Sequence, residues 1–70
     1  MITRFNHDLL LLARQYRGLS QSEVANAAGL DQGYYSRAER GILNAEPSSE
    51  TIDAIAEALN FPKMRLIKPR

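Results

Sequence analysis

The sequence lacks cysteine and tryptophan, and it has few prolines, glycines and aromatic residues. Its 70 residues include 4 Gly, 3 Pro, 3 Tyr and 2 Phe. Without cysteine, neither a disulfide nor a cysteine-ligated metal can hold the chain together, so a hydrophobic core must suffice. The lack of cysteine also fits a reducing compartment, and we expect a cytoplasmic protein.

Long hydrophobic runs and catalytic clusters are missing as well. The longest apolar run, residues 9–13, falls far short of the roughly 20 residues that span a bilayer, so we expect no membrane partner. His7 is the single histidine, which makes metal binding a poor hypothesis. The chain has no nucleophile, histidine and acid set and no phosphate-cradling glycine loop. We therefore expect no enzyme, no cofactor and no small-molecule substrate.

Positive and negative charges nearly cancel. Nine Lys and Arg residues against eight Asp and Glu give a net charge of +1, which argues weakly against nucleic acid because dedicated binders usually show a basic excess. Several of the basic residues crowd the end of the chain: Lys63, Arg65, Lys68 and Arg70. This segment is equally consistent with a solvated end of the chain and with an arm that contacts phosphates.

Helix signals predict an all-α fold, a compact bundle of four to five helices in a single domain that spans residues 1–70. We expect the core within 6–61, followed by 62–70 as a basic tail or a short last helix. The first helix is expected from His7 to Arg17. Four of its residues follow the spacing of one helix face and are expected to face the core: Leu9, Leu12, Ala13 and Tyr16.

Two short helices are expected next, in close succession. Ser20 and Glu23 form the pattern of a capping box, and Gly29 is expected to end the helix that they open. Asp31 can cap the following helix, residues 32–40, which ends at Gly41. At about 100° per residue, its inner side carries Tyr34, Tyr35 and Ala38, and its outer side carries Gln32, Gly33, Ser36, Arg37 and Arg40.

The loop 42–47 leads to a fourth helix, with Ser48 or Ser49 as its cap and Asn60 as its stop. Its inward residues are predicted to be Ile52, Ile55, Ala56 and Leu59. A last turn is expected to begin at Pro62.

The outer side of residues 32–40 bears groups that can read DNA. Glutamine pairs bidentately with adenine, and arginine with guanine. At the start of the preceding helix, Gln21 and Ser22 offer free backbone N–H groups and a positive dipole end to a phosphate oxygen. Together the two helices could straddle a DNA strand.

These residues resemble the Xre-type helix-turn-helix family, the five-helix domain of phage Cro and repressor proteins and of many bacterial regulators. The resemblance rests on RGLSQSEVANAAGLDQGYYSRAERG followed by PSSETIDAIAEAL and covers Leu9 to Phe61. It implies a lambda-repressor-like fold that binds double-stranded DNA sequence-specifically, with the recognition helix 32–40 in the major groove. The implied function is that of a transcriptional regulator, in the first place a repressor, bound as a homodimer to a two-fold-related operator.

The resemblance also implies roles for individual residues. Base contacts are expected from Gln32, Gly33, Ser36 and Arg37, and phosphate contacts from Gln21, Ser22, Tyr34 and Arg40. Arg14 and Glu39 match a structural ion pair that ties the first helix to the third. Ile42, Leu43 and Phe61 are candidates for a dimer contact.

Two alternatives stay open. The helix-turn-helix could serve only as the scaffold of a protein–protein interaction module, which the low net charge and the acidic fourth helix favour. The chain could also be the DNA-binding part of an antitoxin or of a longer regulator. The dependence of affinity on salt concentration distinguishes the first alternative from DNA binding, because phosphate contacts weaken steeply as the salt concentration rises.

Overall fold

The computed structural model describes residues 5–67 of the chain. Within that range the chain forms helices and no strand, which confirms the all-α prediction. The elements are α1 (His7–Arg17), α2 (Gln21–Ala28), α3 (Gln32–Arg40), α4 (Ser49–Leu59) and a short 3-10 helix, η1 (Lys63–Leu66). None of these helices is long and apolar enough to cross a membrane.

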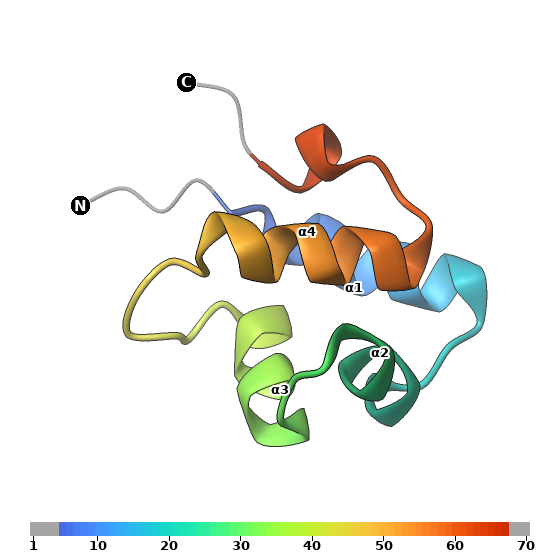
Figure 1. Cartoon of the computed structure of the whole chain (residues 1–70), viewed down its shortest axis with the longest axis horizontal. Coiled ribbons are helices and arrows are strands. Elements are labelled where there is room, and N and C mark those ends of the chain that lie inside the picture. The colour runs from blue at the N-terminus through green and yellow to red at the C-terminus, as the bar shows by residue number, and fades with distance from the viewer. Residues whose placement is uncertain (1–4, 68–70) are drawn as a thin grey trace.

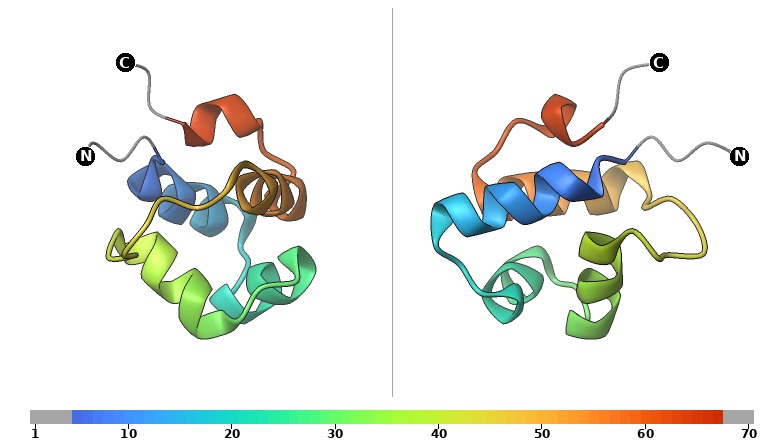
Figure 2. Two further views of the ribbon diagram at one scale, coloured as in Figure 1. Left: turned by 60° about the vertical axis from the view of Figure 1, so that its left-hand side comes forward. Right: turned by 180° about the vertical axis from the view of Figure 1, so that it is seen from behind.

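The helices form two layers. α1 and α4 lie side by side, α2 and α3 pack below them, and η1 covers them from the opposite side (Figures 1 and 2). The recognition helix predicted from the sequence, α3, is therefore at the edge of the molecule farthest from η1. This arrangement leaves one side of α3 without a helix packed on it.

Each α-helix begins after a residue whose side chain caps it. The Ser20 hydroxyl accepts from the Glu23 N–H at 3.0 Å, and the Glu23 carboxylate accepts from the Ser20 N–H at 2.8 Å, which completes the capping box. The other three caps are Asn6, Asp31 and Ser48. The helices end at residues in the left-handed region, namely Gly18, Gly29, Gly41 and Asn60.

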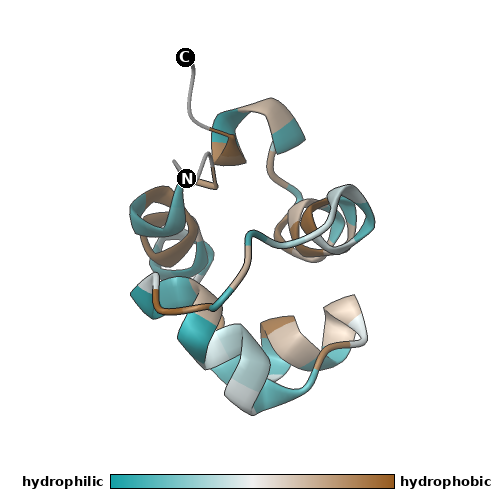
Figure 3. Ribbon diagram, turned by 90° about the vertical axis from the view of Figure 1, so that its left-hand side faces the viewer, coloured by the Kyte–Doolittle hydropathy of each residue, from teal (hydrophilic) through white to brown (hydrophobic). Residues whose placement is uncertain are grey.

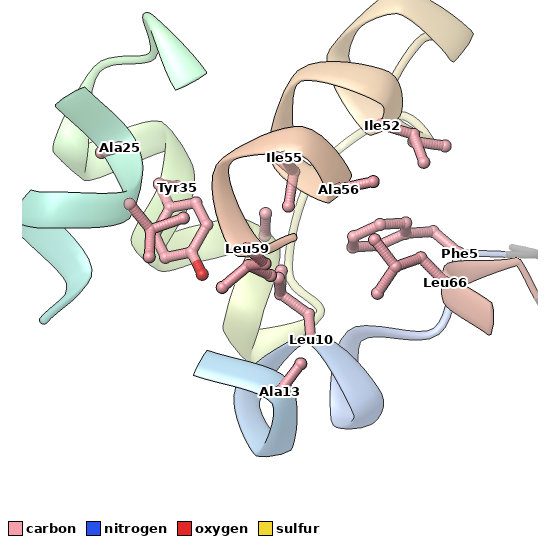
Figure 4. Close-up of a cluster of buried hydrophobic side chains, with 12 residues drawn as sticks. Phe5, Leu10, Ala13, Ala25, Tyr35, Ile52, Ile55, Ala56, Leu59 and Leu66 are labelled. Atoms are coloured by element: carbon pink, nitrogen blue, oxygen red, sulfur yellow. The ribbon is translucent and has the colours of Figure 1, made fainter. Parts of the chain in front are cut away.

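One hydrophobic core joins all five elements. Its buried residues are Phe5, Leu10, Ala13, Val24, Ala25, Tyr35, Ala38, Ile52, Ile55, Ala56, Leu59 and Leu66. The four inward residues predicted for α4 are all among them, so that prediction is confirmed. Figure 4 shows Tyr35 on one side of the α4 side chains and Phe5 with Leu66 on the other. The core thus reaches beyond the expected range of 6–61 at both ends.

The predicted inner face of α1 is correct for Ala13 but wrong for Leu12 and Tyr16. Leu12 is 59% exposed and Tyr16 is 83% exposed, whereas Leu10 is fully buried. The buried face of α1 consists of Leu10 and Ala13, and the two arginines Arg14 and Arg17 point from it toward other helices. Because the charged Arg14 lies largely buried while the apolar Leu12 is exposed, apolar spacing alone did not identify the buried face.

Polar contacts close the two ends of the bundle. Arg17 caps the C-terminus of α4: its Nε donates to the Leu59 carbonyl at 2.9 Å and its Nη2 to the Asn60 carbonyl at 2.7 Å. The exposed Tyr16 ring lies beside the same guanidinium, 5.7 Å from ring centroid to Cζ. The Asn6 N–H donates to the Leu66 carbonyl at 2.7 Å, which holds η1 against the start of α1.

The basic segment that follows α4 is partly bound to the fold. Lys63 Nζ donates to Ser49 Oγ at 2.7 Å and lies 2.9 Å from Asp53 Oδ1. Lys63 is thus engaged by α4. Lys68 and Arg70, which belong to the same predicted arm, lie outside the described residues.

Candidate nucleic-acid interface

A turn of three residues, 29–31, joins α2 to α3. The Leu30 N–H donates back to the Ala25 carbonyl at 2.8 Å, and the Leu30 side chain packs against the core. Asp31 then caps α3 through a 3.2 Å bond from the Tyr34 N–H to Asp31 Oδ2. Turn and cap fix the direction in which α3 leaves α2.

The inner side of α3 is anchored by Tyr35 and Ala38, which are 0% and 1% exposed. On its outer side Gln32, Gly33, Arg37 and Arg40 are exposed, and Ser36 is half-buried. Figure 3 shows that hydrophilic and intermediate residues cover most of α3. The two sides predicted for this helix are therefore confirmed, with Tyr34 half-buried between them.

Arg14 and Glu39 form the expected ion pair between α1 and α3. Arg14 Nε donates to Glu39 Oε2, and Arg14 Nη2 donates to Glu39 Oε1 at 3.1 Å. The pair is largely buried, with 15% of the Arg14 side chain and 3% of the Glu39 side chain exposed. Arg14 Nη1 also donates to the Leu19 carbonyl at 2.9 Å, just before α2. One guanidinium thus links three helices of the domain.

Gln21 joins this ion pair from the first residue of α2. Its Nε2 donates to Glu39 Oε1 at 3.0 Å, so the side chain braces α2 against α3. Its expected contact with a phosphate is not tested by these contacts, and the second Nε2 hydrogen remains available for one.

The pKa values of Arg14, Tyr35 and Glu39 are all shifted from their ordinary values. Burial acts to raise the pKa of Glu39, but hydrogen bonds from Arg14 and Gln21 outweigh it and lower this pKa. The bond to Glu39 raises the pKa of Arg14. Burial, and next the Glu39 carboxylate, raise the pKa of Tyr35. The Tyr35 hydroxyl is buried and forms no hydrogen bond with a residue in 5–67.

Ser22 contacts another candidate residue directly. Its hydroxyl donates to Gln32 Oε1 at 2.8 Å, which joins the first turn of α2 to the first residue of α3. From the sequence we predicted a phosphate contact for Ser22 and a base contact for Gln32, but not the hydrogen bond between these two side chains. The short turn of three residues was the signal that could have brought the two side chains together.

The Arg37 guanidinium reaches back to Gly33 in the first turn of α3. A Cβ added at Gly33 would lie 3.5 Å from Arg37 Nη1 and 3.0 Å from Asp31 Oδ2. The guanidinium therefore lies along the first turn of α3, over the position where the glycine has no side chain. The two residues form one continuous part of the outer face.

Arg37 and Arg40 are the basic groups that this face offers to a polyanion. Neither forms an ion pair with another residue in 5–67. Three other basic residues are engaged within the fold, namely Arg14, Arg17 and Lys63. The positive charge of the face is therefore concentrated in the second half of α3.

The three candidate dimer residues are not brought together. Ile42 and Leu43 lie in the loop before α4, whereas Phe61 follows the C-terminus of α4. Ile42 is 54% exposed, while Leu43 and Phe61 pack against the core. Because these residues lie at opposite ends of α4, one dimer contact would not include all three of them.

The sequence matches the family model described as helix-turn-helix over residues 10–63. Over 55 residues it is 44% identical to the transcriptional regulator ClgR of Mycobacterium tuberculosis, an alignment that covers 79% of this chain and 47% of ClgR. The chain thus spans about half of the length of that relative.

Two solved structures are similar to this fold. The restriction-modification controller protein C.AhdI from Aeromonas hydrophila has a TM-score of 0.78 at 35% identity, over 86% of this chain and 88% of that one. SinR, the master regulator for biofilm formation, solved in complex with DNA, has a TM-score of 0.78 at 27% identity, over 86% of this chain and 94% of that one. With its capped α2, three-residue turn and exposed α3, this chain belongs to the Xre-type, lambda-repressor-like helix-turn-helix family.

Proposed function

We propose that the chain binds double-stranded DNA sequence-specifically and acts in transcriptional regulation, in the first place as a repressor. The observation that carries this proposal is the division of α3, whose inner side is buried while Gln32, Arg37 and Arg40 are exposed on its outer side. A major groove is wide enough to admit such a helix. α3 would enter the groove with its outer side toward the bases.

The side chains of this face fit the edges of base pairs. Gln32 can pair with adenine and Arg37 with guanine, and the Ser36 hydroxyl can serve either a base or a phosphate. Gly33 would let the helix backbone approach the base edges closely. These residues would supply sequence discrimination.

Phosphate contacts would flank the bases on both sides. At the start of α2, the N–H groups of the first turn have no helical acceptor and lie at the positive end of the helix dipole. Gln21 is placed there. Arg40 and Tyr34 would reach the backbone from α3. Such contacts set the register of the protein without reading sequence.

A single copy would bind weakly, because Arg37 and Arg40 are the only exposed cations of the face within residues 5–67. Two copies on a two-fold-related operator would double the contacts. Their recognition helices would then lie one helical turn of DNA apart, about 34 Å. Ile42 and Leu43, at the loop before α4, are our candidates for the contact in such a homodimer, and Phe61 is the alternative.

The relatives support a regulator that works on DNA, and we propose that it does so in the cytoplasm. ClgR is a transcriptional regulator, and SinR was solved bound to DNA. Because the chain covers about half of ClgR, it can equally serve as the DNA-binding part of a longer regulator or of an antitoxin. No catalytic role is proposed, since the outer face of α3 combines amide, hydroxyl and guanidinium groups without a general base.

A protein-interaction module is the second candidate function. The exposure of Leu12 and Tyr16 on α1 favours it, because large exposed apolar side chains gather at protein contacts. This surface lies on a different helix from the α3 outer face. DNA binding therefore predicts that substitutions on the outer face of α3 impair function. A protein-interaction module predicts that substitutions of Leu12 and Tyr16 do.

The proposal is tested by selecting bound sequences from a pool of random duplexes and then measuring affinity against salt. We expect one enriched motif and a steep linear fall of log K with log salt concentration. As matched variants, Arg40→Ala removes a charge from the α3 face and Arg65→Ala removes one from η1. Arg40→Ala should weaken binding and Arg65→Ala should not. A pool without enrichment, or binding that is indifferent to salt, would contradict the proposal.

A further inference from the structure

The start of α3 carries a negative charge on the part of the surface that would face DNA. Asp31 is the N-cap residue of α3 and is exposed. In Figure 1, α3 begins at the lower edge of the molecule, the edge farthest from η1. The N-terminal residues of a recognition helix are the ones that contact base edges. Asp31 is therefore placed at the end of α3 that would reach into the groove.

The Asp31 carboxylate lies on the outer side of the helix, next to Arg37. A Cβ added at Gly33 would lie 3.0 Å from Asp31 Oδ2 and 3.5 Å from Arg37 Nη1. The two charged groups thus flank the bare backbone of Gly33, which belongs to the outer face. Neither of them forms an ion pair with another residue in 5–67. This part of the face therefore offers an acceptor and a donor side by side.

Capping does not account for the charge of Asp31. Its Oδ2 accepts from the Tyr34 N–H at 3.2 Å, and within residues 5–67 the carboxylate forms no other hydrogen bond. Asparagine and serine cap helices about as well as aspartate does. Near the phosphates of DNA a carboxylate is repelled, because the charges are alike. The charge can favour binding only where the carboxylate meets a hydrogen-bond donor.

We infer that Asp31 is a further base-reading residue, which accepts a hydrogen bond from the N4 amino group of a cytosine. This inference rests on the proposed DNA-binding function. An ionised carboxylate has two oxygens that only accept, so turning the side chain does not change what it can read. The donors in the major groove are cytosine N4 and adenine N6. Adenine N6 lies beside the N7 acceptor of the same base, which repels a carboxylate, whereas cytosine presents its amino group alone.

The position of Arg37 agrees with a cytosine contact. A C·G pair presents the N4 donor of cytosine beside the O6 and N7 acceptors of guanine. Arg37 is the residue that we propose for guanine, and it lies across Gly33 from Asp31. We therefore expect this cytosine at or next to the base pair that Arg37 contacts. Thymine in place of the cytosine would turn its O4 acceptor toward the carboxylate and would be penalised.

The test compares the wild type with Asp31→Asn, Asp31→Ser and the control Glu57→Gln. Asparagine and serine both keep the N-cap, so the melting temperature should stay nearly unchanged, as circular dichroism can verify. Glu57 is exposed on α4, so its substitution removes the same charge from another helix. For each protein, affinity is measured for the selected duplex and for each of its single-base-pair variants.

At one position, Asp31→Asn should lower the preference for cytosine over thymine about tenfold, the factor of one hydrogen bond to a charged group. The asparagine amide can donate to thymine O4, which the carboxylate cannot. Asp31→Ser should lose the same preference, because the carboxylate is gone. Glu57→Gln should keep every base preference of the wild type.

A modified base tests the contact itself. In N4-methylcytosine a methyl group replaces the amino hydrogen that points into the major groove, while pairing with guanine is kept. At the position found with Asp31→Asn, this base should lower the affinity of the wild type about tenfold. It should leave the affinity of Asp31→Ser nearly unchanged. An equal loss in the two proteins would overturn the inference, because the methyl group would then disturb another residue.

Two results of the variant series would also overturn it. One is that Asp31→Asn keeps every base preference of the wild type. The other is an equal gain of affinity for all sequences, which is the behaviour of a charge that only repels phosphates. If the wild type selects no DNA sequence, the proposed function fails and this inference fails with it. If the wild type selects a sequence and one of these results is found, only the role of Asp31 fails.

Discussion

Arg14 Nη2 donates to Glu39 Oε1 over 3.1 Å and so joins the first helix to the recognition helix. Glu39 is the buried charged residue of α3, and Gln21 of α2 shares the same carboxylate oxygen. The orientation of the outer face of α3 therefore depends on a polar cluster on its inner side. This dependence leads to the first two predictions.

Replacing Arg14 by methionine should destabilise the domain by about 3 kcal/mol. The substitution keeps most of the side-chain volume but leaves the buried Glu39 carboxylate without its cation. Urea unfolding followed by circular dichroism measures the change. The matched control is Arg65→Met, at an exposed arginine of η1, which should stay within about 0.5 kcal/mol of the wild type. An equally small change for Arg14→Met would show that the pair behaves like an exposed one.

Acid should destabilise the domain through Glu39, whose pKa is lowered in the folded state. The unfolded chain then binds the proton first, so the stabilisation is complete above the ordinary glutamate value of 4.5 and is lost as pH falls through the lower folded pKa. The free energy of unfolding, measured in urea from pH 7 downward, should show this fall. Glu39→Gln should flatten it, whereas Glu57→Gln, on the exposed side of α4, should leave it intact. Identical pH profiles for the two variants would contradict the assignment.

Arg17→Ala should destabilise the domain by about 1–2 kcal/mol, because two hydrogen bonds to carbonyls at the end of α4 are lost. The same guanidinium also offsets the negative end of the α4 dipole. Thermal unfolding gives the change, with Arg65→Ala as the control. An unchanged melting temperature would mean that water replaces the guanidinium at no cost.

Leu10→Ala should cost about 2–5 kcal/mol, since it opens a cavity in the core. Tyr16→Ser on the same helix should change stability by no more than about 0.5 kcal/mol, because the ring is exposed. Urea unfolding of both variants tests which face of α1 is buried. If DNA binding is the function, Tyr16→Ser should also keep the wild-type affinity for DNA. A loss of affinity for DNA in that variant would contradict the assignment of DNA binding to the outer face of α3 alone.

The helices of this domain could be predicted from the sequence because their boundaries are local. A capping side chain and a residue that adopts the left-handed region need no distant partner, and Ser20 with Gly29 fixed α2 in this way. α4 was equally clear, since its inward positions are all apolar and its outward ones polar.

The inner face of α1 could not be found in this way. Four leucines in succession, residues 9–12, satisfy the spacing of more than one helix face. The buried face is continued by Arg14, which pairs with Glu39 of α3, and the exposed Arg17 next to it binds carbonyls at the end of α4. Such partners are distant in sequence, so the polar residues argued against the correct face.

The exposed outer face of α3 could be predicted from the sequence, but the hydrogen bonds within the candidate site could not. The outer face of α3 followed from helical periodicity. The bond from Ser22 to Gln32 depends on how the two helices cross, which the sequence of either helix alone does not specify. The approach of the Arg37 guanidinium to Gly33 was likewise not predicted.

The claim that α3 reads bases in the major groove is tested most directly by removing one hydrogen-bond acceptor from the DNA. In the selected duplex, each guanine is replaced in turn by 7-deazaguanine, which lacks the N7 acceptor of the major groove. At one guanine the wild-type affinity should fall about tenfold, the loss of a charge-assisted hydrogen bond. Arg37→Ala should bind the modified and unmodified duplexes equally well. The account is contradicted if no guanine N7 matters to the wild type, or if Arg37→Ala still loses the same factor.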